Sequence, residues 1–254
     1  MTVWYMNGAG NSFAVIDARN ISIDMSDMAK KLCQERNCDG FMALDNSDIA
    51  DFKLHFYNCD GSRAGMCGNG ARCICRFAYD NKIAGEQMRV ETDAGIVEGA
   101  RIKDNVYSVK LNTPKDIKLD IVPYVDYVIV GVPHAVIELE SLDAYSRDEL
   151  FERAKKLREE LDAHVNFYSV LDRNTVDILT YERGVENFTL ACGTGSGAVA
   201  AILWIRGEME SSTLTVENQG GVLRVTVEGE WLTPKELFLS GNAEIDEVEN
   251  INNY

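Results

Sequence analysis

The sequence has little positive charge and no long apolar run. It contains 25 Lys and Arg residues against 41 Asp and Glu residues, which gives a formal net charge of -16. Because binding to nucleic acid or to an anionic membrane requires a basic face, we expect neither partner. The longest apolar run, residues 198–205, is far shorter than the ~18 residues that a membrane span requires. No basic start followed by an apolar segment marks a secretory signal, so we expect a soluble, cytoplasmic protein.

Motifs for metal and nucleotide binding are also absent. There is no C-x2-C pair, and the three histidines are scattered along the chain at His55, His134 and His164. The glycine-rich turn at Gly193 fits neither the G-x-G-x-x-G nor the G-x-x-x-x-G-K pattern of nucleotide-binding loops. The sequence therefore predicts no metal site and no nucleotide cofactor.

Apolar periodicity predicts a mixed α+β fold. A chain of 254 residues is long enough for two modest lobes. Alternating apolar and polar residues indicate half-buried strands at residues 51–57, 176–181 and 222–227. Helical spacing indicates helices at residues 26–33 and 146–162, the latter with a capping box of Ser146 and Glu149, and two further helices that begin at Cys67 and Cys192.

The two halves of the chain contain similar segments. CGNGARCICRFAYD begins at Cys67 and CGTGSGAVAAILWI begins 125 positions later, at Cys192. We expect two topologically similar lobes, each with one Cys-Gly-Xaa-Gly helix start, and an active site in the cleft between them. Only four positions carry the similarity, so chance is the alternative. The expected lobes are residues 1–115, completed by residues 243–254, and residues 116–242, with a linker near residues 113–118.

Two cysteines at helix starts favour acid–base chemistry. A helix N-terminus carries roughly half a positive charge and presents backbone N–H groups without an intrahelical partner. Such a position lowers the pKa of a thiol from about 8.5 toward neutrality. The N–H groups of Gly68 and Asn69, and those of Gly193 and Thr194, are suited to hold a carboxylate.

This arrangement predicts a racemase or epimerase that needs no cofactor. Removal of an α proton builds negative charge on the substrate carboxylate, which fixed N–H donors stabilise. One thiolate would remove the proton, and the opposite thiol would return another, inverting the stereocentre. Two other classes remain open: a thiol redox protein and a non-catalytic amino-acid binder. The other five cysteines are expected to be structural: Cys33, Cys38, Cys59, Cys73 and Cys75.

Along nearly its full length the chain resembles the diaminopimelate epimerase family. The resemblance rests on YMNGAGNSFAVID, NCDGSRAGMCGNGARC and YERGVENFTLACGTGSGA. It implies two pseudo-symmetric lobes, each a small mixed sheet curled around a central helix, with neither pyridoxal phosphate nor metal, and a homodimer. It also implies a set of site residues. Cys67 and Cys192 are the acid/base pair, His134 and Glu182 influence the protonation of the thiols, and the substrate is bound by Asn11, Asn58, Gly68, Asn69, Arg183, Gly193 and Thr194.

Two positions depart from the family pattern. The family has an asparagine before its Pro-His pair and another in an Asn-Val-Xaa-Phe segment, and both help to hold the distal end of the substrate. This sequence has Val132 and His164 at those positions. Valine neither donates nor accepts a hydrogen bond, and imidazole offers a different geometry. The sequence therefore predicts the reaction but leaves two substrates open: a different amino acid, such as histidine, or diaminopimelate itself.

Overall fold

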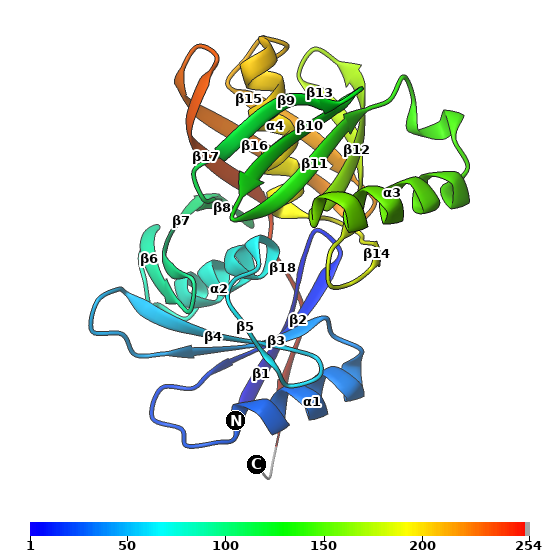
Figure 1. Cartoon of the computed structure of the whole chain (residues 1–254). Coiled ribbons are helices and arrows are strands. Elements are labelled where there is room, and N and C mark those ends of the chain that lie inside the picture. Colours follow the sequence, from blue (N-terminus) through cyan, green and yellow to red (C-terminus); the bar gives the residue numbers. More distant parts are fainter. Residues whose placement is uncertain (252–254) are drawn as a thin grey trace. The chain divides into compact units, whose positions relative to one another are not determined.

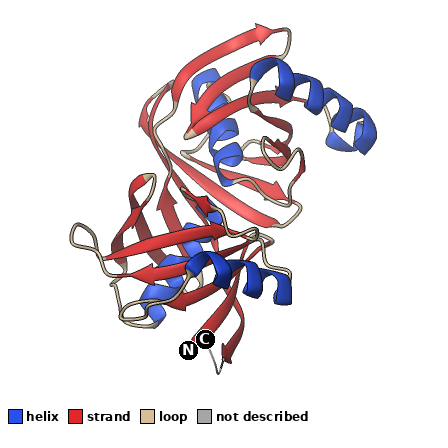
Figure 2. Cartoon of the chain, turned by 60° about the horizontal axis from the view of Figure 1, so that its bottom comes forward, coloured by secondary structure: helices blue, strands red, loops and turns tan. Residues whose placement is uncertain are grey.

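The computed structural model of the chain describes residues 1–251, and it divides into two compact units. The first comprises Met1–Val109 together with the segment from Gly241 onward, and the second comprises Lys110–Ser240. Figure 1 colours the elements along the chain, and Figure 2 shows the strands and helices from which each unit is built. No helix in the described part of the chain is long and apolar enough to cross a membrane.

The first unit contains a mixed sheet and two helices. An antiparallel hairpin joins β1 and β2, a parallel crossover through α1 leads to β3, and β3 continues antiparallel into β4. β4 pairs with both β5 and β6, and β6 continues through β7 to β8. The bounds are β1 (Thr2–Gly8), β2 (Asn11–Asp17), α1 (Met25–Arg36), β3 (Gly40–Asp45), β4 (Phe52–Asn58), β5 (Arg63–Ala64), α2 (Gly68–Asp80), β6 (Gln87–Thr92), β7 (Gly95–Lys103) and β8 (Val106–Lys110).

The second unit repeats this order of elements. β10 and β11 form a hairpin, α3 leads to a parallel β12, β12 continues antiparallel into β13, and β13 pairs with both β14 and β15. The bounds are β9 (Lys115–Val122), β10 (Val125–Val130), β11 (Val132–Glu138), the short helix η1 (Leu142–Ala144), α3 (Arg147–Leu161), β12 (His164–Asp172), β13 (Thr175–Glu182), β14 (Asn187–Phe188), α4 (Gly193–Arg206), β15 (Thr213–Asn218), β16 (Gly221–Glu230) and β17 (Thr233–Asn242).

The two helices that follow Cys67 and Cys192 are the central helices of their units. α2 packs against β1, β2, β3 and β7, and α4 packs against β10, β11, β12 and β16, which are the corresponding strands. Residues 198–204 of α4 are all buried, as expected for a helix that is apolar on every side. Gly207 ends α4 in the left-handed conformation, with φ 71°, and its N–H bonds to Leu203 and Trp204.

The second helix of each unit covers the outside of the sheet. α1 contacts β2, β3 and β4, and α3 contacts β11, β12 and β13. The Ser146 side chain caps α3 by accepting a hydrogen bond from the Glu149 N–H at 3.2 Å, as the sequence predicted. Leu150, Ala154 and Leu157 form the buried face of this helix. The apolar faces of α1 and α3 thus close the cores of their units.

The expected linker differs from the structure, and the expected C-terminal segment lies in part outside it. The segment near residues 113–118 is not simply a linker, because β9 begins at Lys115. Within the expected C-terminal segment, β18 (Glu244–Asn250) pairs antiparallel with β1. The end of that segment, residues 252–254, lies outside the described residues. Cys59 is exposed, so it is no core residue, whereas Cys33, Cys38, Cys73 and Cys75 are buried.

Candidate active site

The strand register equates residues of the two units. Phe13 pairs with Gly40 in the first unit as His134 pairs with His164 in the second. Counting back two residues along β2 and β11 places Asn11 at the position of Val132. The equivalence therefore puts a polar amide in one unit and an apolar side chain in the other.

The same register equates Asn58 with Glu182 and Cys67 with Cys192. Asn58 pairs with Gly40. In the second unit Val165 pairs with Tyr181, so the antiparallel register puts Glu182 opposite His164, the residue equivalent to Gly40. Asn58 and Glu182 therefore occupy equivalent positions. Tyr57 pairs with Arg63, and Tyr181 pairs with Phe188. Cys67 lies four positions after Arg63, and Cys192 lies four positions after Phe188, which makes the two cysteines equivalent. The repeated motif in the sequence is therefore a repeat of structure.

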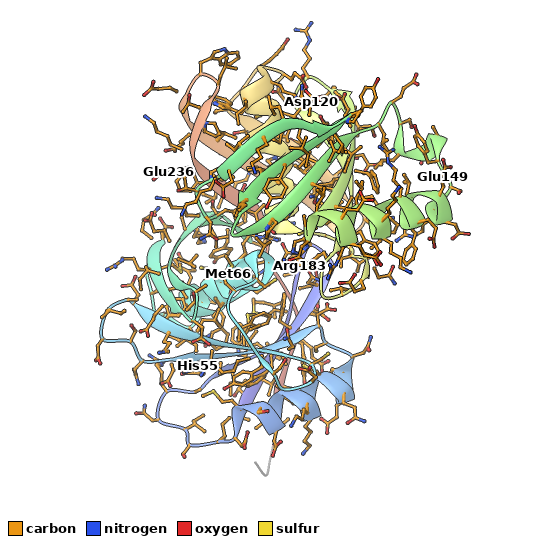
Figure 3. All side chains as sticks on the ribbon, in the orientation of Figure 1. His55, Met66, Asp120, Glu149, Arg183 and Glu236 are labelled. Carbon is orange, nitrogen blue, oxygen red and sulfur yellow. The ribbon has the colours of Figure 1, made fainter. Side chains whose placement is uncertain are left out.

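Cys67 is the N-cap residue of α2. Its backbone is extended, with φ -127° and ψ 124°, and its carbonyl accepts the first helical hydrogen bond, from Ala71, at 2.7 Å. The thiol is partly exposed. In Figure 3, Met66 marks the segment that leads into this helix. The position gives Cys67 the polarised N-terminal environment that the sequence predicted.

A hydrogen-bond network supports the first turn of α2. Buried Asn69 donates from Nδ2 to Asn11 Oδ1 at 2.6 Å, and Arg72 donates to Asn69 Oδ1 at 3.0 Å. Asn58 donates instead to Ser62 Oγ at 2.9 Å. Arg72 is fully buried, and burial lowers its pKa, while the neighbouring thiols, among them Cys73 and Cys67, raise it. Sequence reasoning missed Arg72, although it lies five positions after Cys67.

Cys192 is the corresponding N-cap residue of α4. Its Sγ atom accepts a hydrogen bond from the Gly195 N–H at 3.4 Å and lies 3.5 Å from Thr194 Oγ1. Its carbonyl accepts from Ser196 N–H at 2.9 Å. The residue is 5% exposed, less than Cys67. An N–H···S hydrogen bond favours the thiolate form of the cysteine.

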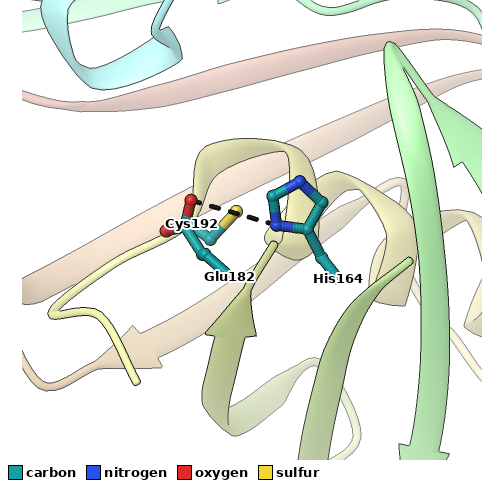
Figure 4. A group of neighbouring side chains, drawn as sticks. All are labelled: His164, Glu182 and Cys192. Atoms are coloured by element: carbon teal, nitrogen blue, oxygen red, sulfur yellow. Dashed lines mark ion pairs between the residues drawn. The ribbon is translucent and has the colours of Figure 1, made fainter. Parts of the chain in front are cut away.

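Glu182 and His164 lie next to this thiol. One donor atom from each of His164, Glu182 and Cys192 lies within 4.8 Å of the other two. Figure 4 shows the three side chains. Glu182 Oε1 accepts a hydrogen bond from Thr189 Oγ1 at 2.5 Å. Burial raises the pKa of Glu182, and hydrogen bonds with Thr189 and Cys192 partly offset that rise. The Glu182 carboxyl is thus placed to influence the protonation of the Cys192 thiol.

The two histidines of this unit are stacked. The rings of His134 and His164 have centroids 5.0 Å apart and an interplanar angle of 22°. Asn166 Nδ2 lies 3.1 Å from His134 Nδ1 and also donates to the Ala135 carbonyl at 2.9 Å. Since the Asn166 amide can only donate from that nitrogen, His134 Nδ1 is the acceptor and Nε2 carries the ring proton. Sequence reasoning missed Asn166, a polar residue on an otherwise buried strand.

Both imidazoles are neutral at pH 7. Burial is the main cause that lowers the pKa of His134 well below its usual value, and it lowers the pKa of His164 to about 4. The positive charge of Arg183 acts in the same direction on His164. Arg183, labelled in Figure 3, donates to the carbonyl and the carboxylate of Asp162, each at 2.9 Å. His164 is the imidazole that has a ring nitrogen within 4.8 Å of the Cys192 sulfur.

The chain matches known proteins over most of its length. A profile of the diaminopimelate epimerase family matches residues 3–120 and 127–245. The diaminopimelate epimerase of Aquifex aeolicus is 35% identical over 95% of this chain and 94% of its own length. The diaminopimelate epimerase of Nitratiruptor sp. is 37% identical over 89% of this chain and 90% of its own.

The chain belongs to the diaminopimelate epimerase family. It is an isomerase of the amino-acid racemase and epimerase class. The expectation of a two-lobed α+β fold is confirmed as well. A phenazine biosynthesis protein of the PhzF family from Bacillus anthracis matches with a TM-score of 0.77 at 15% identity over 99% of both chains. A hydroxyproline epimerase from Agrobacterium vitis matches with a TM-score of 0.70 at 16% identity, over 99% of this chain and 90% of its own.

Proposed function

We propose that this isomerase inverts the α carbon of an amino acid with Cys67 and Cys192 as its acid/base pair. The observation that carries the proposal is the structural repeat, which gives both thiols the same N-cap position on a central helix. In the proposed reaction one thiolate removes the α proton and the other thiol supplies the new one. The N–H groups of Gly68 and Asn69, and of Gly193 and Thr194, hold the carboxylate while charge builds on it.

The proposed roles of the other residues follow from their contacts. Glu182 is hydrogen-bonded with Cys192 and in this proposal sets the protonation of that thiol. His134 acts through His164, on which it is stacked. Asn11 fixes the first turn of α2 through Asn69. These are positioning roles, because none of these groups needs to touch the migrating proton.

Exchange of the α hydrogen in D2O tests the two-thiol reaction. In Cys67→Ser and Cys192→Ser, racemisation should fall by about 10²–10⁴-fold, since each variant lacks one acid/base group. Cys59→Ser changes an exposed cysteine outside the proposed site and should racemise at the wild-type rate. Circular dichroism checks that each variant is folded. Racemisation at the wild-type rate in both active-site variants would rule out the two-thiol reaction.

We further propose that the preferred substrate is an amino acid other than diaminopimelate, histidine being one candidate. Val132 offers no hydrogen bond to a distal ammonium or carboxylate, and His164 presents a neutral imidazole. A charged group brought to such a site would lose hydration without full compensation. The names of the relatives favour diaminopimelate as the alternative substrate.

Kinetics with a panel of L-amino acids and LL-diaminopimelate decide between the two substrates. We expect another amino acid to exceed LL-diaminopimelate in kcat/KM. The double variant Val132→Asn/His164→Asn should shift that ratio toward diaminopimelate by at least about tenfold, because it restores two amide groups. A wild-type preference for diaminopimelate would contradict the substrate proposal and leave the two-thiol reaction intact.

The proposed reaction has consequences for environment and assembly. Two thiols that work as acid and base must remain reduced, so we place the protein in a reducing compartment, the cytoplasm. We also propose a homodimer, as the family resemblance implies. Sedimentation equilibrium measures the mass in solution, and a single-chain mass of 28.3 kDa at micromolar concentration would contradict the dimer.

A further inference from the structure

The second unit contains a group of donor atoms that resembles a metal site. His164, Glu182 and Cys192 each supply one donor, and these three atoms lie within 4.8 Å of one another. Figure 4 shows the imidazole, the carboxylate and the sulfur converging from different elements of the unit. His164 begins β12, Glu182 ends the neighbouring strand β13, and Cys192 caps α4. Imidazole, carboxylate and thiolate are the three ligand types that bind zinc in proteins.

His164 has a ring nitrogen that lacks a protein partner among the described residues. Its Nδ1 atom is buried and makes no hydrogen bond, and the residue as a whole is only 8% exposed. The same atom lies 4.0 Å from Glu182 Oε2, too far for a hydrogen bond. A buried nitrogen without a partner costs free energy, so this atom is suited to bind a ligand. A neutral imidazole with a free lone pair is the form that metals bind.

The charges also favour a divalent cation. Carboxylate and thiolate, the forms in which Glu182 and Cys192 would bind a metal, each carry one negative charge, and imidazole binds as a neutral ligand. A divalent ion would bring the group to zero net charge in surroundings where few water molecules can screen it. The Gly195 N–H already donates to Cys192 Sγ at 3.4 Å, and Thr189 already donates to Glu182, so both anionic ligands are oriented by hydrogen bonds.

The distances allow a tetrahedral ion after small side-chain movements. Zinc binds sulfur at about 2.3 Å and nitrogen or oxygen at about 2.0–2.2 Å, so its ligand atoms are roughly 3.5 Å apart. The three donors would draw together by roughly 1 Å from their present maximum separation of 4.8 Å. Rotation of the Glu182 side chain, which is 22% exposed, can supply this movement while the strands stay fixed. Three protein ligands leave a fourth position open.

We propose that His164, Glu182 and Cys192 bind a thiophilic divalent cation, best fitted by Zn²⁺. The inhibitory effect rests on the acid/base role proposed above for Cys192, because a sulfur bound to the ion can neither remove nor return a proton. On binding, the Cys192 thiol releases its proton to solvent and its sulfur coordinates the ion. The oxidation states of sulfur and zinc do not change. The ion would act as a reversible inhibitor that a chelator removes.

Titration of the full-length, chelator-treated protein with ZnCl₂ tests the site, with a chromogenic chelator as competitor. The wild type should bind one Zn²⁺ per chain with a defined Kd. Since losing even a group that only supports a ligand weakens metal binding by about 10–100-fold, His164→Asn should weaken the Kd by at least about 100-fold. His55→Asn and Cys59→Ser are the matched controls, because each removes a histidine or cysteine in the other unit, and both should retain the wild-type Kd.

Cobalt substitution gives a readout that does not depend on activity. Co²⁺ added to the wild type should produce a sulfur-to-cobalt charge-transfer band, which Cys192→Ser should lose and His55→Asn should keep. If Cys192→Ser does not fold, His164→Asn provides the comparison, because it keeps the thiol. Equal zinc affinity in the wild type and His164→Asn would overturn the proposal, as would a cobalt complex without a sulfur band. Neither result bears on the D2O exchange assay, so the proposed function is tested separately.

Discussion

Replacement of Asn166 by leucine tests whether one buried amide holds the histidine pair in place. Asn166 is fully buried and makes three side-chain hydrogen bonds. It donates to His134 Nδ1 at 3.1 Å and to the Ala135 carbonyl at 2.9 Å, and it accepts from Thr180 Oγ1 at 3.0 Å. Leucine has the same number of side-chain heavy atoms with the same branching, and it can make none of these bonds. The substitution therefore removes the polar contacts and keeps the branched shape of the side chain.

The magnitude follows from the three groups that lose their partner. A typical buried hydrogen bond contributes about 1 kcal/mol, and each buried donor or acceptor left unsatisfied costs about 1–3 kcal/mol. His134 Nδ1, the Ala135 carbonyl and the Thr180 hydroxyl share this loss, and neighbouring losses are not additive. We expect Asn166→Leu to lower the free energy of unfolding by about 2–5 kcal/mol. Thr180→Val, which removes only one of the bonds, should cost about 1 kcal/mol.

Urea unfolding and nitrogen NMR together check this reasoning. Urea unfolding of the wild type, Asn166→Leu and Thr180→Val gives the changes in free energy, provided that the dependence on urea is the same for all three. Histidine ¹⁵N shifts report which ring nitrogen of His134 carries the proton. In the wild type, the proton should be on Nε2, and Asn166→Leu should release this preference. A loss below 1 kcal/mol together with an unchanged tautomer would refute the assigned role of Asn166.

Three further predictions follow from pKa values, close approaches and burial. Because the folded pKa of His164 is about 4 and its usual value is 6.5, the unfolded chain binds more protons between these values, so stability falls as the pH drops from 6.5 to 4. Urea unfolding at pH 6.5 and 4.5 measures how far the free energy of unfolding falls between these two pH values. The fall should be smaller in His164→Asn than in the wild type, by on the order of 3 kcal/mol at most. Equal falls in the two proteins would contradict this prediction. A Cβ on Gly195 would lie 2.3 Å from Asn166 Oδ1, whereas one on the equivalent Gly70 would lie 3.1 Å from a flexible Met42 sulfur. Gly195→Ala should therefore lower the free energy of unfolding by about 1–3 kcal/mol, and Gly70→Ala should lower it less. Thermal unfolding measures both changes, and the reverse order would argue against the register. Iodoacetamide at pH 8 should label the exposed Cys59 in the native protein, as mass spectrometry of peptides would show. The cysteines expected to stay unlabelled, because burial raises their pKa to about 11 or 12, are Cys33, Cys38, Cys73 and Cys75; their labelling at the rate of Cys59 would contradict the assigned burial.

Local signals in the sequence were sufficient to predict most helices and some strands. Ser146 and Glu149 form the start of α3 because a cap and a first turn are determined by residues that are near in sequence. The same holds for the helix starts at Cys67 and Cys192, where glycines interrupt the strand pattern. The C-terminal strand β18 was missed because its charged residues give no apolar period, and it forms through pairing with β1, at the other end of the chain.

The candidate site could be predicted only where the role of a residue depends on its type and on its neighbours in the sequence. Cysteine at a helix start indicates acid–base chemistry from a few neighbouring letters. Asn166 gives no such signal, because its role depends on His134, which reaches it only through the parallel pairing of β11 with β12. The metal-like group was missed for the same reason. His164 and Glu182 are far apart in sequence and meet because their strands are paired.

The structural repeat suggests how reaction and substrate preference are divided within the chain. The register gives both units the cysteine and its glycine, and these are the residues on which the proposed proton transfer depends. It gives the units different residues at the other equivalent positions, with Asn11 against Val132 and Asn58 against Glu182. A helix start can polarise a thiol whatever side chains surround the substrate, because the effect comes from the backbone. Substitutions at Val132 and His164 can therefore change which amino acid binds while the proposed two-thiol reaction is retained. This is why the Val132→Asn/His164→Asn variant should alter substrate preference without abolishing exchange at the α carbon.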